Sequence, residues 1–164
     1  MNYHNIYYCD MLNGSGIRVT LWVAGCTHRC KNCQNPITWD SDGGIIFDDK
    51  AMNEILKALN YDYISGLTLS GGDPLHPSNR DEILNICKVV KQNFPQKNIW
   101  MYTGYTFEEI QESPILQHID ILVDGPYIEE QRDITLPFRG SKNQRLIDVK
   151  ETLKQGQIIQ YKIN

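Results

Sequence analysis

Three cysteines lie close together in the segment VAGCTHRCKNCQNP, residues 23–36. Cys26, Cys30 and Cys33 follow the spacing C-x3-C-x2-C. Thiolates at such short spacings bind soft metal ions or iron–sulfur clusters, because one loop presents several sulfur atoms together. A closed zinc or cluster site usually takes four protein ligands, so this segment is one ligand short. The missing ligand is therefore the first question about this site.

Three kinds of site fit these cysteines. A structural zinc site needs a fourth ligand. Such sites generally combine one C-x2-C pair with a second, distant pair of ligands, and this sequence has no second pair. The candidates for a fourth zinc ligand are His28, Cys9 and Cys87. Cys87 is better explained as a small core residue on the apolar face of a helix. A redox pair of Cys30 and Cys33 leaves Cys26 without a role. A cluster held by three thiolates leaves one iron open, as catalytic zinc sites leave a position open.

The other candidates for chemistry stand at the ends of predicted strands. The glycine-rich turn LSGGDP (69–74) follows one of them. Glycines let the backbone approach a ligand and leave N–H and C=O groups free. Two further strands end at Thr103–Gly104 and at Asp124–Pro126. By themselves, the residues at these two strand ends are explained equally well as turn formers and as ligand contacts. Because parallel strands place their carboxyl ends at one rim, we expect these residues and the cysteine loop to lie together there.

An alternating framework has to position these segments. Apolar or β-branched runs predict strands over 17–24, 64–70, 98–103 and 119–124. Apolar residues at helical spacing predict a helix over 48–59. The same spacing together with capping residues predicts helices from Asn79 to Phe94 and from Thr106 to near Pro114. Residues 127–144 are typical of a polar loop, and 145–149 and 157–163 can form later strands. This alternation predicts an α/β fold with a parallel sheet, either open and doubly wound or a barrel fragment.

Composition narrows the class of protein. The chain has 164 residues, of which 41% are hydrophobic and 22% charged, which suits a single domain over residues 1–164. A net charge of −4 gives no general attraction to nucleic acid or to anionic membranes. We expect neither a signal peptide nor a membrane span, since no apolar run reaches ~18 residues. Five cysteines, an odd number, favour metal ligands in the reducing cytoplasm over a disulfide framework.

C-x3-C-x2-C directly after a buried strand resembles the signature of the radical S-adenosylmethionine (SAM) superfamily. Further segments make the resemblance more specific. They are GC-x-H-x-C-x-x-C, TLSGGDPL, LVDGPY and RGS-x-NQR-x-IDV, and they occur in family order over roughly residues 5–160. NGSGIR (13–18) is similar to the D-G-P-G-I-R segment of glycyl-radical-enzyme activases. Together they resemble the activating proteins of anaerobic (class III) ribonucleoside-triphosphate reductases. Two departures are Asn32, where many superfamily members have an aromatic residue, and Asp73, where glutamate is common.

The resemblance implies one [4Fe-4S] cluster and SAM as cofactors, with the amino and carboxylate groups of SAM on the open iron. The implied cluster ligands are Cys26, Cys30 and Cys33. The residues implied to contact SAM are Gly71, Gly72 and Asp73 for its methionine part, and Thr103, Gly104 and Asp124 for its ribose or carboxylate. His28 and Asn32 are expected beside these groups, with His28 donating to a cluster sulfur.

The same resemblance implies the activity. The reduced cluster passes one electron to SAM, the S–C5′ bond breaks, and a 5′-deoxyadenosyl radical removes hydrogen from a backbone glycine of the reductase. The implied partners are the catalytic subunit of that reductase and a reductant such as a flavodoxin. The implied fold is a shortened partial (β/α) barrel of parallel strands with flanking helices, whose open side admits the glycine loop. Two alternatives stay open: activation of another glycyl radical enzyme, and a zinc-stabilised, non-catalytic binding module.

Overall fold

The structure is a computed structural model that describes residues 1–163. Within that range one sheet contains every strand. The strands are β1 (Asn2–Asp10), β2 (Ile17–Val23), β3 (Ile45–Ile46), β4 (Ile64–Gly71), β5 (Asn98–Tyr102), β6 (Ile121–Asp124) and β7 (Arg145–Asp148). The α-helices are α1 (Asp49–Leu59), α2 (Arg80–Asn93), α3 (Phe107–Ile110) and α4 (Val149–Gln155). The 3₁₀ helices are η1 (Pro36–Thr38), η2 (Pro114–Gln117) and η3 (Glu129–Gln131).

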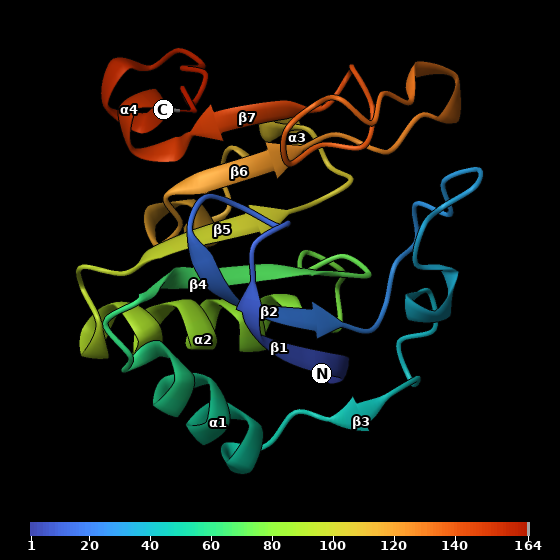
Figure 1. Ribbon diagram of the computed structural model, residues 1–164. Helices are drawn as coiled ribbons and strands as arrows, with labels where there is room; N and C mark the ends of the chain where they lie inside the picture. The colour runs from blue at the N-terminus through green and yellow to red at the C-terminus, as the bar shows by residue number, and fades with distance from the viewer. Residues whose placement is uncertain (164) are drawn as a thin grey trace.

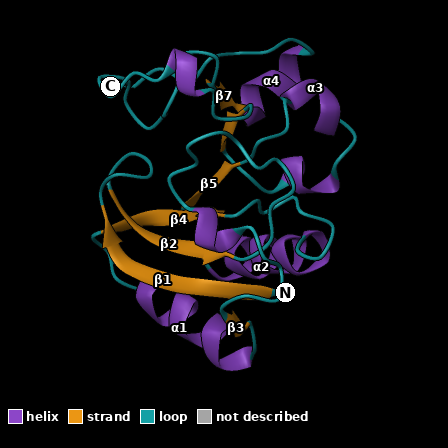
Figure 2. Ribbon diagram, turned by 90° about the vertical axis from the view of Figure 1, so that its right-hand side faces the viewer, coloured by secondary structure: helices purple, strands orange, loops and turns teal. Residues whose placement is uncertain are grey.

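The sheet has the order β3-β1-β2-β4-β5-β6-β7. β2, β4, β5 and β6 are parallel, whereas β1 and β7 pair antiparallel with them at the two sides and β3 pairs antiparallel with β1. The predicted α/β class and the parallel centre of the sheet are thus confirmed. In Figure 1, α1 and α2 lie on the same side of the sheet, and the four parallel strands all end on the right. In Figure 2 that end faces the viewer and consists largely of loops.

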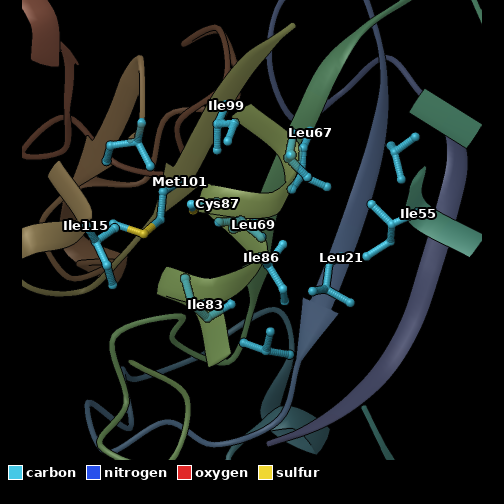
Figure 3. Close-up of a cluster of buried hydrophobic side chains, with 14 of the residues drawn as sticks. Leu21, Ile55, Leu67, Leu69, Ile83, Ile86, Cys87, Ile99, Met101 and Ile115 are labelled. Atoms are coloured by element: carbon cyan, nitrogen blue, oxygen red, sulfur yellow. The ribbon is translucent and has the colours of Figure 1, made fainter. Parts of the chain in front are cut away.

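The main core lies between the sheet and the helices. Alternate side chains of the parallel strands point to this side, because successive residues of a strand face opposite ways. The labelled core residues in Figure 3 are Leu21, Leu67, Leu69, Ile99 and Met101 from the strands, Ile55, Ile83, Ile86 and Cys87 from α1 and α2, and Ile115 from η2. Burying each large aliphatic side chain contributes roughly 1.5–3 kcal/mol. This layer holds the strand ends in fixed positions relative to one another.

The opposite face of the sheet is polar and aromatic. Arg18 is fully buried there, donates to Thr68 Oγ1 (2.6 Å) and to the carbonyl oxygen of Leu67 (2.7 Å), and lies over the Trp100 ring, 5.4 Å from its centroid. Burial lowers the pKa of Arg18 to about 10, so the guanidinium stays charged at neutral pH. A buried charge is tolerated here because it is hydrogen-bonded. A small cluster around Trp100 and Phe138 covers the β6 and β7 end of this face.

One predicted strand is absent, and two strands of the structure, β1 and β3, were not predicted. β1 was not expected, because only Tyr3 and Ile6 are buried in it and bulges shift its register, which removes the period-two signal. The segment 157–163 was expected to form a strand, but it makes only an isolated bridge between Gln160 and Ile147. The expected strand over 145–149 is present as β7.

Of the two predicted helix caps, one is present and one is absent, and the structure adds a third cap at Asp48. The carboxylate of Asp48 accepts from the Ala51 amide (3.0 Å) and caps α1. Thr106 and Glu109 form the expected capping box, although α3 ends at Ile110, earlier than expected. The expected side-chain cap by Asn79 on α2 is wrong, since its amide donates instead to the Ala24 and Asp73 carbonyl oxygens (2.8 and 3.0 Å). Among the helices within residues 1–163, none combines the length and apolar character needed to cross a membrane.

Candidate metal and cofactor site

The cysteine loop begins directly after β2 and is clipped to the chain that follows it. The Gly25 and Cys26 amides donate to the Thr38 and Trp39 carbonyl oxygens (2.8 and 3.1 Å). Cys33 closes a turn on the Cys30 carbonyl oxygen (3.1 Å). Because both ends of the loop are anchored by backbone hydrogen bonds, the three thiols between them have defined positions.

All three cysteines line one large cavity. Its volume is about 1120 Å³, and it lies at the carboxyl ends of the parallel strands. The predicted site residues that line it are Cys26, Cys30, Cys33, His28, Gly71, Gly72, Asp73, Thr103 and Gly104. Parallel strands bring these residues together although they are spread over nearly 80 positions of the sequence. Their individual roles remain predictions.

The glycine turn after β4 packs directly on the start of the cysteine loop. The Gly72 amide donates to the Val23 carbonyl oxygen (2.8 Å), and the Asp73 amide donates to that of Gly25 (2.7 Å). Gly71 has φ +112°, and a Cβ on Gly72 would lie 2.4 Å from the Gly25 oxygen. Only glycine fits such a close backbone approach. With these two amides already bonded, the groups that the turn offers to a ligand are its carbonyl oxygens.

Asp73 lies at the centre of the polar contacts around the cavity. Its side chain is almost fully buried. Oδ1 accepts from the Leu75 amide (2.8 Å) and from Thr103 Oγ1 (2.9 Å). Oδ2 lies 2.7 Å from His28 Nε2 and accepts from the Gly104 amide (3.0 Å). The carboxylate therefore links the ends of β4 and β5 to the cysteine loop.

His28 packs between Asp73 and the end of β5. Its ring stands edge-on to Tyr105, with centroids 4.6 Å apart, and a Cβ on Gly104 would lie 2.4 Å from the ring. The hydrogen bond to Asp73 raises the pKa of His28, against the opposing effect of burial. We expected His28 to donate to a cluster sulfur. In the structure its Nε2 is occupied by the Asp73 carboxylate.

Two predicted residues do not line the cavity. The carboxylate of Asp124 accepts from the Phe107 amide (2.7 Å) and is ion-paired with Arg145, so it joins α3 to β7. Asn32 is exposed and has φ +55°. Asparagine tolerates this left-handed conformation better than a bulky aromatic residue does. The backbone of the loop thus accounts for asparagine at this position.

The three thiols are of the type that iron–sulfur clusters use as ligands. Within residues 1–163, no group of three His, Cys, Asp or Glu side chains is close enough to hold one metal ion. Zinc needs its ligands to converge on one centre at ~2.3 Å, whereas the thiolates of an iron–sulfur cluster bind separate irons. Burial raises the pKa of Cys26 and Cys30, so binding of iron releases their protons. The Asn35 amide donates to Cys33 Sγ (3.4 Å), the kind of contact that orients a thiolate ligand.

Sequence comparison defines the class of protein to which this site belongs. Residues 12–147 match the family model described as a 4Fe-4S single cluster domain, so the chain is a member of this family of cluster-binding domains. The match spans the cysteine loop, the glycine turn and every strand of the parallel centre.

Similar proteins define the family more narrowly. The chain is 47% identical over 146 residues to the anaerobic ribonucleoside-triphosphate reductase-activating protein of Enterobacteria phage T4, covering 89% of this chain and 93% of that protein. Its identity to the proteins of that name from Haemophilus influenzae and Escherichia coli K12 is 47% and 40% over 148 residues, covering 88% of this chain and 96% of each relative. The chain therefore belongs to the family of anaerobic ribonucleoside-triphosphate reductase-activating proteins, as its motifs indicated.

Sequence reasoning missed the residues at the far side of the cavity. Met11 and Leu12, after β1, and Ile134, in the long loop before β7, line the cavity although they are exposed. Tyr102 also lines it, with a buried hydroxyl that has no hydrogen-bond partner within residues 1–163. None of these residues belongs to a recognisable motif. Exposed apolar residues in two separate loops were the available signal, but only the fold brings those loops to the same cavity.

Proposed function

We propose that this protein generates a glycyl radical on an anaerobic ribonucleoside-triphosphate reductase, using one [4Fe-4S] cluster and SAM. The observation that carries the proposal is that three free cysteines and the glycine turn line one cavity, in a chain of this family. When bound, the cluster supplies one electron for cleavage of SAM, and the resulting radical removes hydrogen from a glycine of the partner.

The residues of the chain have separate roles in this proposal. Cys26, Cys30 and Cys33 hold the cluster as thiolates. Carbonyl oxygens of the Gly71–Gly72 turn accept hydrogen bonds from the SAM ammonium, because the neighbouring amides already bond to the chain. The strand end at Thr103–Gly104 forms the cavity wall next to this turn. We propose no contact between Asp124 and SAM, since its carboxylate is taken by Phe107 and Arg145.

The lining of the cavity supports a protein substrate. Met11, Leu12 and Ile134 give its far side an exposed apolar lining, which is typical of surfaces that meet another protein. We propose that the sheet is a shortened partial (β/α) barrel and that the reductase glycine loop enters at this open side.

The proposal also requires an electron donor and a reducing compartment. Reductive cleavage of SAM consumes one electron, which a low-potential protein such as a flavodoxin can supply. All five cysteines are free thiols, which suits the cytoplasm.

Anaerobic purification tests the function directly. We expect about four irons with matching sulfide per chain, as in one cubane cluster. Adding dithionite and SAM should yield 5′-deoxyadenosine, and adding the reductase should yield an EPR-detectable glycyl radical on it. One zinc without sulfide would establish the alternative of a non-catalytic binding module. SAM cleavage with a radical formed only on a different glycyl radical enzyme would establish the other alternative.

A further inference from the structure

We propose that Asp73 positions the cysteine loop and makes no direct contact with SAM. The proposal deepens the proposed function at the same site. A carboxylate offers about four lone-pair sites for hydrogen bonds. Those of Asp73 are occupied by the Leu75 and Gly104 amides, the Thr103 hydroxyl and the His28 ring. With 1% of the residue exposed, no acceptor position is left for the SAM ammonium.

The contact with His28 is the one that reaches the metal ligands. His28 stands between Cys26 and Cys30 in the loop, so fixing its ring fixes the backbone that carries both thiols. Because an ionised carboxylate only accepts, Nε2 of His28 is the donor in the 2.7 Å contact. Tyr105 and Gly104 hold the ring from the other sides. The loop therefore has a side-chain anchor within the cavity in addition to its backbone clips.

The anchor also connects the loop to two strands. Asp73 follows β4, and Thr103 and Gly104 follow β5, so one carboxylate spans three segments that are distant in the sequence. Loss of the Asp73 charge leaves buried donors without an acceptor, which is more costly than loss of an exposed hydrogen bond. The expected consequence is a loosened cysteine loop, whether or not SAM is bound.

Iron release without SAM separates positioning from SAM binding. The cluster-loaded protein is mixed with an iron chelator in the absence of SAM, and the release rate is followed by absorbance. A residue that acts only on SAM cannot change this rate. We expect Asp73→Asn and His28→Phe each to speed release ~10-fold, the effect typical of losing a group that orients a metal ligand. His28→Phe keeps the ring packing on Tyr105 and removes only the hydrogen bond.

A double-variant cycle tests whether the two residues act together. The combination of Asp73→Asn with His28→Phe should release iron no faster than the stronger single variant, because both remove the same anchor. Asp42→Asn is the matched control, an exposed aspartate on the segment that follows the loop, and it should release iron at the wild-type rate. Unchanged release for Asp73→Asn, together with weaker SAM binding, would overturn the proposal. So would fully additive effects in the cycle.

A second measurement keeps the test independent of the cluster and of the proposed function. In the metal-free protein, alkylation of Cys26 and Cys30 should be faster in the same variants, as measured by mass spectrometry. If Asp73→Asn does not fold, the rates of iron release and of cysteine alkylation in His28→Phe and Thr103→Val decide the question. A wild-type protein without iron or sulfide would contradict the proposed function, while equal alkylation rates in all variants would contradict the positioning role.

Discussion

At the residue scale, the five cysteines show that environment decides what a thiol does. Cys26 and Cys30 are partly buried at the cavity, Cys9 is exposed on β1, and Cys87 is fully buried on α2. Burial raises the pKa of Cys87 to about 12, so its thiol stays protonated. A protonated, buried thiol is neither a nucleophile nor a metal ligand. Cys87 is therefore a core residue.

Alkylation should distinguish Cys87 from the loop cysteines. At pH 8, a pKa of about 12 leaves only about one Cys87 thiolate in 10⁴, and the side chain is inaccessible as well. In metal-free native protein, iodoacetamide should modify Cys26, Cys30 and Cys33 and leave Cys87 unmodified until denaturant is added. Peptide mass spectrometry measures each site, and rapid labelling of native Cys87 would contradict its place in the core.

Alanine substitutions should separate the proposed cluster ligands from the core cysteine. Cys30→Ala should abolish iron and sulfide binding and change the free energy of unfolding of the metal-free protein little, since the loop is not core. Cys87→Ala should keep the cluster but lower the free energy of unfolding by about 1–2 kcal/mol, because it leaves a small cavity. Iron analysis and urea denaturation check the pair. Loss of iron from Cys87→Ala would show that a ligand has been misassigned.

At the element scale, Asp120 fastens two helices to the sheet. Its carboxylate accepts from Lys91 of α2 (2.6 Å), from Lys150 of α4 (2.5 Å) and from the Ile99 amide of β5 (2.7 Å). Burial by itself raises the pKa of Asp120, but these contacts outweigh burial and lower it below its ordinary value. The helices that flank the parallel centre are thus held by charge as well as by apolar packing.

The stability contributed by Asp120 should depend on pH. A carboxylate whose pKa is lowered by folding stabilises the protein fully above its unfolded pKa of ~3.9, and that contribution falls as pH drops through the folded pKa. Asp120→Asn should lower the free energy of unfolding by about 1–3 kcal/mol at pH 7. Below about pH 4 the difference from wild type should shrink. Urea denaturation at several pH values measures this, and a constant difference would contradict the ion-pair role.

At the scale of the whole molecule, the fold brings exposed apolar residues from two separate loops to the cavity that the cysteine loop lines. Leu12 follows β1 and Ile134 precedes β7, strands that lie at opposite sides of the parallel centre. Both residues line the cavity that the three loop cysteines also line. We propose that the protein substrate contacts the chain here, because apolar contacts are typical of the buried centre of protein interfaces.

A charge introduced at this apolar surface should weaken the reaction with the reductase. Ile134 is 84% exposed, so Ile134→Asp is compatible with folding. We expect it to raise the KM for the reductase at least ~10-fold, since it puts a charge into an apolar contact. Ile46→Asp is the matched control, because Ile46 is 74% exposed on β3 and does not line the cavity. Equal KM values for both variants would place the docking surface elsewhere.

Local sequence signals were sufficient for the parts of this protein that depend on local geometry. The spacing of Cys26, Cys30 and Cys33 predicted a metal loop, and β-branched runs predicted the parallel strands, because both patterns act over a few residues. The family followed from motifs in order along the chain. β1 was not predicted because a largely exposed, bulged strand has no regular apolar alternation.

The contacts of individual polar side chains were decided only by the tertiary structure. Asp73 and Asp124 both follow a strand and both looked like cofactor contacts in the sequence. The fold places His28, Thr103 and Gly104 around Asp73, inside the cavity, but places Phe107 and Arg145 around Asp124, away from it. Their partners are distant in the sequence, and a carboxylate bonds to whichever donors packing brings near. Residue type and strand position therefore determined where chemistry can occur, and packing decided which side chains are free to perform it.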